Sequence, residues 1–145
     1  MAAPNDASGL DLVWLGADAQ GWLAAFVTAG EGPVPTAALP YALGEPDLES
    51  QLLLLPVRGS QVLLTTVPDP SSFIELSSRG LFVFDWTDVH RTLRDATQRY
   101  ELVCRPLHPL SVEALPPALQ IAARAALLEG VRFTEQTSVM LGLAG

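Results

Sequence analysis

The stretch LVWLGADAQGWLAAFV, residues 12–27, decides the fold. Its two ends, 12–15 and 22–27, are apolar runs with aromatic and β-branched residues, which favour strands. The segment between them, 16–21, contains glycine and aspartate and is typical of a turn. The stretch therefore predicts a β-hairpin with a slightly long loop, and hence an antiparallel pair of strands.

Further strands and helices are expected after this hairpin. Apolar and β-branched runs predict strands over 61–67, 81–84 and 99–105. Capping residues, prolines and apolar periodicity predict helices over 47–55, 70–76, 88–93 and 117–129. Gly80 is expected to end the second of these helices in a left-handed conformation.

In two segments the apolar residues do not recur with the spacing of a helix or a strand. The prolines and glycines of 30–41 predict a loop or an extended edge. The segment 131–145 is compatible with one more strand or with an apolar tail. Together the elements predict a single α+β domain over 1–145, with flexible ends at 1–9 and 142–145. Its sheet has about five strands, antiparallel or mixed, and packs with about three or four helices.

The composition supports one folded domain. The chain has 145 residues, of which 49% are hydrophobic and 17% are charged. A chain of this length can bury a core without metals or disulfides. A disordered chain would be more polar and more charged.

Negative charge is concentrated in the first part of the chain. The net charge is −8, and the segment 1–57 holds seven acids and no base, whereas 58–145 holds nine acids and eight arginines. Such a field repels nucleic acid and steers a basic protein into contact. The predicted partner-binding residues are the acids Asp18, Glu31, Glu45, Asp47 and Glu49.

The sequence also indicates a compartment. Cys104 is the single cysteine, so an internal disulfide is excluded. The first residues do not resemble a secretory signal, and the longest charge-free runs, 19–30 and 32–44, are too short to span a bilayer as helices. We therefore expect a cytoplasmic protein without a membrane anchor.

Most catalytic and cofactor motifs are missing from the sequence. It contains neither a P-loop nor a dinucleotide-binding glycine pattern, and without lysine it cannot form a Schiff base. Zinc would have to rely on Cys104, His90 and His108, and Pro106 prevents Cys104 and His108 from sharing a helix face. No cofactor and no metal are therefore expected.

One polar cluster leaves an alternative open. Asp85, Asp88 and His90 follow a predicted strand and could form a metal site or an acid–base pair, with Arg79 as a further member. Each also has a local structural role, because Asp85 can end the strand and Asp88 can lie in the first turn of a helix. The structural interpretation is favoured.

Several short patterns carry a family resemblance. They are W14-L15-G16-x-D18-x-x-G21-W22-L23-A24-x-F26-x-T28-x-G30, then P33-V34-P35, F82-V83-F84-D85-W86 and Y100-E101-L102. In these patterns, which span most of its length, the chain resembles small bacterial immunity proteins found beside polymorphic or contact-dependent toxins. The resemblance implies a cytoplasmic, often acidic domain that binds a cognate toxin and blocks it, without catalysis.

Three functions remain as hypotheses. The first is a non-enzymatic binding module, most concretely an immunity or antitoxin-like inhibitor whose acidic surface binds a toxin. The second is a bacterial secretion chaperone for an effector protein. The third is a small enzyme that uses Asp85, Asp88 and His90. The sequence leaves the oligomeric state open.

Overall fold

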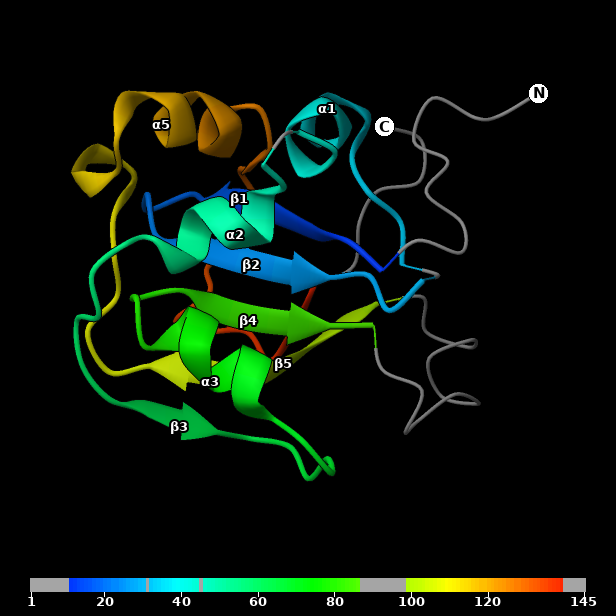
Figure 1. The fold of residues 1–145 in the computed structure, drawn as a ribbon, viewed down its shortest axis with the longest axis vertical. Helices are drawn as coiled ribbons and strands as arrows, with labels where there is room; N and C mark the ends of the chain where they lie inside the picture. The colour runs from blue at the N-terminus through cyan, green and yellow to red at the C-terminus, as the bar shows by residue number, and fades with distance from the viewer. Residues whose placement is uncertain (1–10, 31, 45, 87–98, 140–145) are drawn as a thin grey trace.

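The fold is built on one mixed sheet (Figure 1). The computed structural model describes residues 11–30, 32–44, 46–86 and 99–139. The strand order is β3-β5-β4-β2-β1-β6, and β7 pairs with β5. The strands are β1 (Val13–Asp18), β2 (Leu23–Val27), β3 (Gln61–Leu63), β4 (Phe82–Asp85), β5 (Tyr100–Pro106), β6 (Leu127–Leu128) and β7 (Ser138–Val139).

The predicted hairpin is confirmed, with a shorter turn than expected. Strands β1 and β2 are antiparallel, with Val13 opposite Val27 and Ala17 opposite Leu23. The first strand continues through Gly16 to Asp18. A side chain at Gly16 would come within 3.3 Å of the Ala126 carbonyl, so the glycine belongs to a tightly packed strand rather than to the turn.

The sheet is mixed, one of the two predicted alternatives, because two of its pairings are parallel. Strand β2 runs parallel to β4, and β1 runs parallel to β6. The remaining pairs, including β4 with β5 and β5 with β3, are antiparallel. Among the described residues the sheet has seven strands, because β6 and β7, of two residues each, add to the expected set.

Helices form close to most of the expected positions. They are η1 (Thr36–Ala38), α1 (Leu39–Ala42), α2 (Leu48–Leu53), α3 (Ser71–Ser77), η2 (Val112–Ala114) and α5 (Pro117–Arg124). Gly80 has φ +97°, which agrees with the expected left-handed end after α3. The helical turn expected over 88–93 lies outside the described residues.

Three expectations were wrong in part. The helix expected over 117–129 ends at Arg124, because Leu127–Leu128 pairs with β1 instead of continuing the helix. The segment 30–41 contributes η1 and most of α1, since Pro40 lies in the first helical turn, where its missing N–H costs little. The strand expected over 61–67 is limited to Gln61–Leu63.

Side chains alternate between two cores on the two faces of the sheet. Leu15 and its neighbours on one face pack with buried leucines of α2, α3 and α5. Figure 1 shows α2 and α3 in front of the sheet, and α1 and α5 above β1. The opposite face is aromatic and includes Trp14, Phe26, Tyr100 and Phe133.

The aromatic core also satisfies its polar atoms. The ring of Trp14 stacks on Phe26 with a centroid distance of 4.0 Å. The indole N–H of Trp14 donates to the Tyr100 hydroxyl at 3.2 Å, and this hydroxyl donates to the Pro33 carbonyl at 2.8 Å. The hydrogen bonds therefore tie β1, β5 and the segment before η1 together, and they give both the Trp14 indole and the Tyr100 hydroxyl a partner.

Candidate functional site

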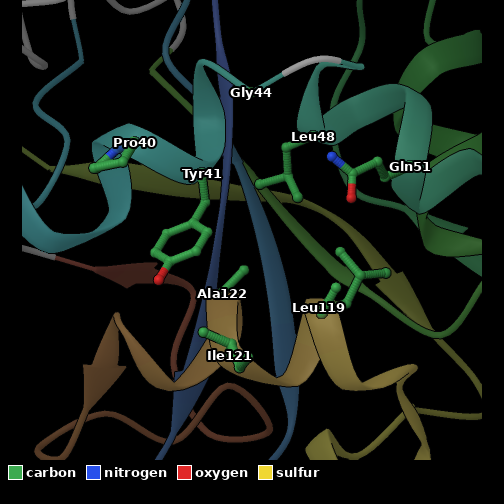
Figure 2. A pocket seen from close by; sticks show the side chains of 9 residues that line it. Pro40, Tyr41, Gly44, Leu48, Gln51, Leu119, Ile121 and Ala122 are labelled. Atoms are coloured by element: carbon green, nitrogen blue, oxygen red, sulfur yellow. The ribbon is translucent and has the colours of Figure 1, made fainter.

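A groove lies between α1, α2 and α5 (Figure 2). Its volume is about 290 Å³. Leu48 of α2 and Leu119 and Ala122 of α5 are buried and form its floor. Tyr41 of α1 and Ile121 of α5 are exposed and form part of its rim. The groove therefore combines an apolar floor with apolar side chains that a partner can reach.

Local sequence explains why the groove stays open. Gly44 lies between α1 and α2 and lines the groove without a side chain. The side-chain amide of Gln51 donates to the Pro46 carbonyl at 2.8 Å, which holds the entry to α2 against its first turns. On α5, the small Ala118 and Ala122 face the groove where larger residues would fill it.

Two of the predicted acids lie at the start of α2, the helix whose Leu48 and Gln51 line the groove. Asp47 caps the helix: its Oδ1 accepts from the Ser50 hydroxyl at 2.7 Å, and this bond is the largest cause that lowers the pKa of Asp47. Partial burial raises the pKa of Glu49, and the charges of Asp47 and Asp11 raise it further. The two aspartates therefore repel the Glu49 carboxylate in the free protein.

Asp18, the first of the predicted partner-binding residues, lies inside the protein. Only 1% of it is exposed. Its Oδ1 accepts from the N–H groups of Gln20 at 2.9 Å and Trp22 at 3.0 Å, and its Oδ2 accepts from the N–H of Phe133 at 2.8 Å. The expectation that Asp18 projects toward a partner is therefore wrong: it closes the β1–β2 turn and binds the C-terminal segment.

The predicted acidic set is only partly brought together. Asp47 and Glu49 are close neighbours on α2, while Glu31 and Glu45 lie outside the described residues. The sequence analysis missed the groove residues Tyr41 and Ile121. Ile121 gave a usable signal, because it is a large apolar residue that does not share a helix face with Leu119, Ala122 and Ala123, which are buried. Tyr41 gave none, since its segment was expected to be a loop.

A second depression, of about 420 Å³, lies beside the β1–β2 turn. Its lining includes Gln20, Leu127 and two opposite charges, Arg124 and Glu113, whose nearest atoms are 4.0 Å apart. The carboxylate of Asp18 is already held by three backbone N–H groups. This depression has mixed charge, so it suits a basic partner less well than the groove does.

The cluster considered for catalysis is described only in part. Asp85 is buried at the end of β4, opposite Glu101 of β5, while Asp88 and His90 lie outside the described residues. Burial raises the pKa of the Cys104 thiol, which favours the protonated form, and His108 is exposed. Within the described ranges, no three histidine, cysteine, aspartate or glutamate side chains are grouped as metal ligands would be.

Comparison with known proteins adds no homologue. No family model, no curated protein and no solved structure matches the chain. The described part of the chain also contains no helix that is long and apolar enough to cross a membrane. The functional argument therefore rests on the groove and on the charge around it.

Proposed function

We propose that the protein is a non-enzymatic binding module, an immunity or antitoxin-like inhibitor that binds a cognate bacterial toxin in the cytoplasm. The observation that carries the proposal is the groove between α1, α2 and α5, with Asp47 and Glu49 at the start of α2. An apolar floor beside a negative helix end suits a basic protein segment that carries one apolar anchor.

The charge pattern supports this class of partner. Asp47, Glu49 and Asp11 lie close enough for the two aspartates to raise the pKa of Glu49. A lysine or arginine of a partner would relieve this repulsion and would gain more from three acids than from an isolated one. The base-free segment 1–57 would attract such a partner from a distance and raise the association rate at low salt.

The groove itself supplies the first test. Ile121 is 58% exposed on its rim, and Leu127 is 49% exposed at the second depression, so the two residues form a matched pair. Ile121→Asp is expected to weaken toxin binding by at least about tenfold, whereas Leu127→Asp changes it by less than about threefold. The partner to use is the product of the neighbouring gene, with titration calorimetry and toxin activity as readouts.

The outcomes separate the alternatives. A neighbouring gene product that neither binds nor is inhibited contradicts the proposal. A reversed order, with Leu127→Asp the weaker binder, moves the site to the second depression. Binding to an unfolded partner and not to the folded one favours the secretion chaperone instead.

Glu49 supplies a second test, which separates binding from stability. Because its pKa is raised, its charged form is less favourable in the folded protein than in the unfolded chain. This cost is absent below the ordinary pKa of 4.5 and grows as the pH rises through the higher folded value. Glu49→Gln is therefore expected to raise the free energy of unfolding slightly at neutral pH, by no more than about 0.5 kcal/mol, and to weaken toxin binding.

Urea unfolding at about pH 4 and about pH 7 checks the first part, since the gain should be present only at the higher pH. Calorimetry with the same partner at low and high salt checks the second part. Glu129→Gln removes the same charge from an exposed site outside the groove and serves as the control. A Glu49→Gln protein that is clearly destabilised, or that binds the toxin as tightly as the wild type, contradicts the role proposed for Glu49.

A further inference from the structure

The groove between α1, α2 and α5 has an aromatic ring on one side and a polar amide on the other. Figure 2 shows the ring of Tyr41 and the side-chain amide of Gln51 on opposite sides of it. Both residues line the groove, and none of its described lining residues is charged. An entering side chain therefore meets a ring and an amide as well as the apolar floor.

The hydrogen bond of Gln51 fixes which atom of its amide a partner can use. The Nε2 atom donates to the Pro46 carbonyl at 2.8 Å, so this end of the amide is occupied. Among the residues that the structure describes, no donor is bonded to Oε1. Figure 2 shows this oxygen on the side of the amide that faces Leu119. Oε1 is therefore a free acceptor at the wall of the groove.

Further acceptors lie along the same wall. The carbonyl oxygens of Tyr41 and Pro46 lie 3.4 Å and 3.6 Å from the position that a side-chain carbon of Gly44 would take. The backbone N–H of Gln51 donates to the Asp47 carbonyl at 3.2 Å, so Asp47 lies one helical turn before Gln51. A ligand at this wall meets oxygen acceptors and a nearby carboxylate, and hydrogen-bond donors with a positive charge complement them.

We propose that the side chain bound in the groove is an arginine of the partner. This inference rests on the proposed function for the identity of the partner, and it names one residue that supplies both the apolar anchor and the positive charge. The aliphatic stem of the arginine packs on Leu119 and Ile121, while its planar guanidinium lies against the Tyr41 ring and donates to Oε1 of Gln51. The guanidinium has several N–H donors, so it can also pair with the Asp47 carboxylate.

Other side chains satisfy these groups less completely. A leucine or phenylalanine would fill the apolar floor, but it would cover Oε1 of Gln51 without donating to it, which costs free energy. A lysine carries the charge, but its compact and strongly hydrated ammonium group does not stack on a ring as a guanidinium does. An aspartate or glutamate would be repelled by Asp47. Arginine combines a stem for the floor, a flat cation for Tyr41 and donors for Gln51.

Small probes that contain no toxin test the choice of side chain. The N-acetyl N-methylamides of arginine, lysine and leucine are titrated to about 20 mM into isotope-labelled protein at constant ionic strength, and the backbone amide NMR signals are followed. The arginine probe is expected to shift the signals of Gly44, Gln51 and Ile121 and to bind at least about threefold more tightly than the other two probes. The signals of Gln20 and Leu127, which line the second depression, should not shift.

Two variants at Tyr41 test the role of the ring. Tyr41→Phe keeps the ring and is expected to keep the preference for arginine, whereas Tyr41→Leu keeps an apolar wall and is expected to lower the preference over lysine by about threefold. Thermal unfolding shows that each variant is folded. An arginine probe that leaves the groove signals unchanged, a lysine or leucine probe that binds as tightly, or a Tyr41→Leu protein with the wild-type preference overturns the proposal.

The probes and the toxin give independent results. If Ile121→Asp weakens toxin binding but the arginine probe shows no preference for the groove, the groove is the toxin site and arginine is not its ligand. If the neighbouring gene product does not bind while the arginine probe selects the groove, the proposed function is wrong and the arginine site stands.

Discussion

Replacement of Asp18 by alanine is expected to lower the free energy of unfolding by about 3 kcal/mol or more. The substitution removes the acceptor of three backbone N–H groups, those of Gln20, Trp22 and Phe133. A buried N–H without a partner costs about 1–3 kcal/mol, and the Phe133 bond is fully buried. Water can replace the acceptor for Gln20, which is exposed, so the three costs do not add in full.

Urea unfolding followed by tryptophan fluorescence measures this loss. Asp18→Asn is the informative control, because its amide oxygen can still accept from Gln20 and Trp22 while its NH₂ group faces the Phe133 N–H. It is expected to lose about 2 kcal/mol. An Asp18→Ala protein within about 0.5 kcal/mol of the wild type would contradict the stabilising role of these three hydrogen bonds.

Phe133→Ala is expected to cost about 3–5 kcal/mol, the usual range for a buried phenylalanine. The ring is fully buried, and its centroid lies 5.5 Å from that of Phe84, 5.7 Å from that of Phe82 and 6.1 Å from that of Phe26. Alanine leaves a cavity among these three rings, and rigid aromatic neighbours on paired strands cannot collapse into it.

Phe133→Leu serves as the milder variant and is expected to lose about half as much, because part of the volume remains. Thermal unfolding should rank wild type, leucine and alanine in that order. The double variant Asp18→Ala/Phe133→Ala should lose less free energy of unfolding than the sum of the two single losses, because both substitutions release the same segment. Full additivity would show that the Phe133 ring and the Asp18 hydrogen bond act independently.

The two positions also show what the sequence could and could not predict. The hairpin was predictable because its strands and turn are neighbours in the chain, and the aspartate was correctly placed at a turn. Its third hydrogen bond goes to Phe133, at a separation of 115 residues. Such a partner leaves no local pattern, so an acid in a loop was assigned to the surface when it is in fact buried.

In the candidate site, too, local features were predictable and long-range packing was not. The start of α2 was predictable from Pro46 and Asp47, because helix starts have a local signature, although Asp47 caps the helix and does not lie in its first turn. The groove was not, because it depends on how far apart three helices pack and on the small residues between them. The end of α5 was misplaced for a related reason: pairing of Leu127–Leu128 with β1 outweighs the helix propensity of the alanine-rich segment.

The bond between Asp18 and Phe133 sets an order of events during synthesis. The hairpin leaves the ribosome first, yet the aromatic face that carries Trp14 and Phe26 is completed by a residue made more than a hundred positions later. A chain stalled before Phe133 exposes that face, because it lacks the segment that covers it and whose Phe133 N–H donates to Asp18. Protease resistance is therefore expected to appear late and in one step, after translation has passed β7, rather than to grow strand by strand.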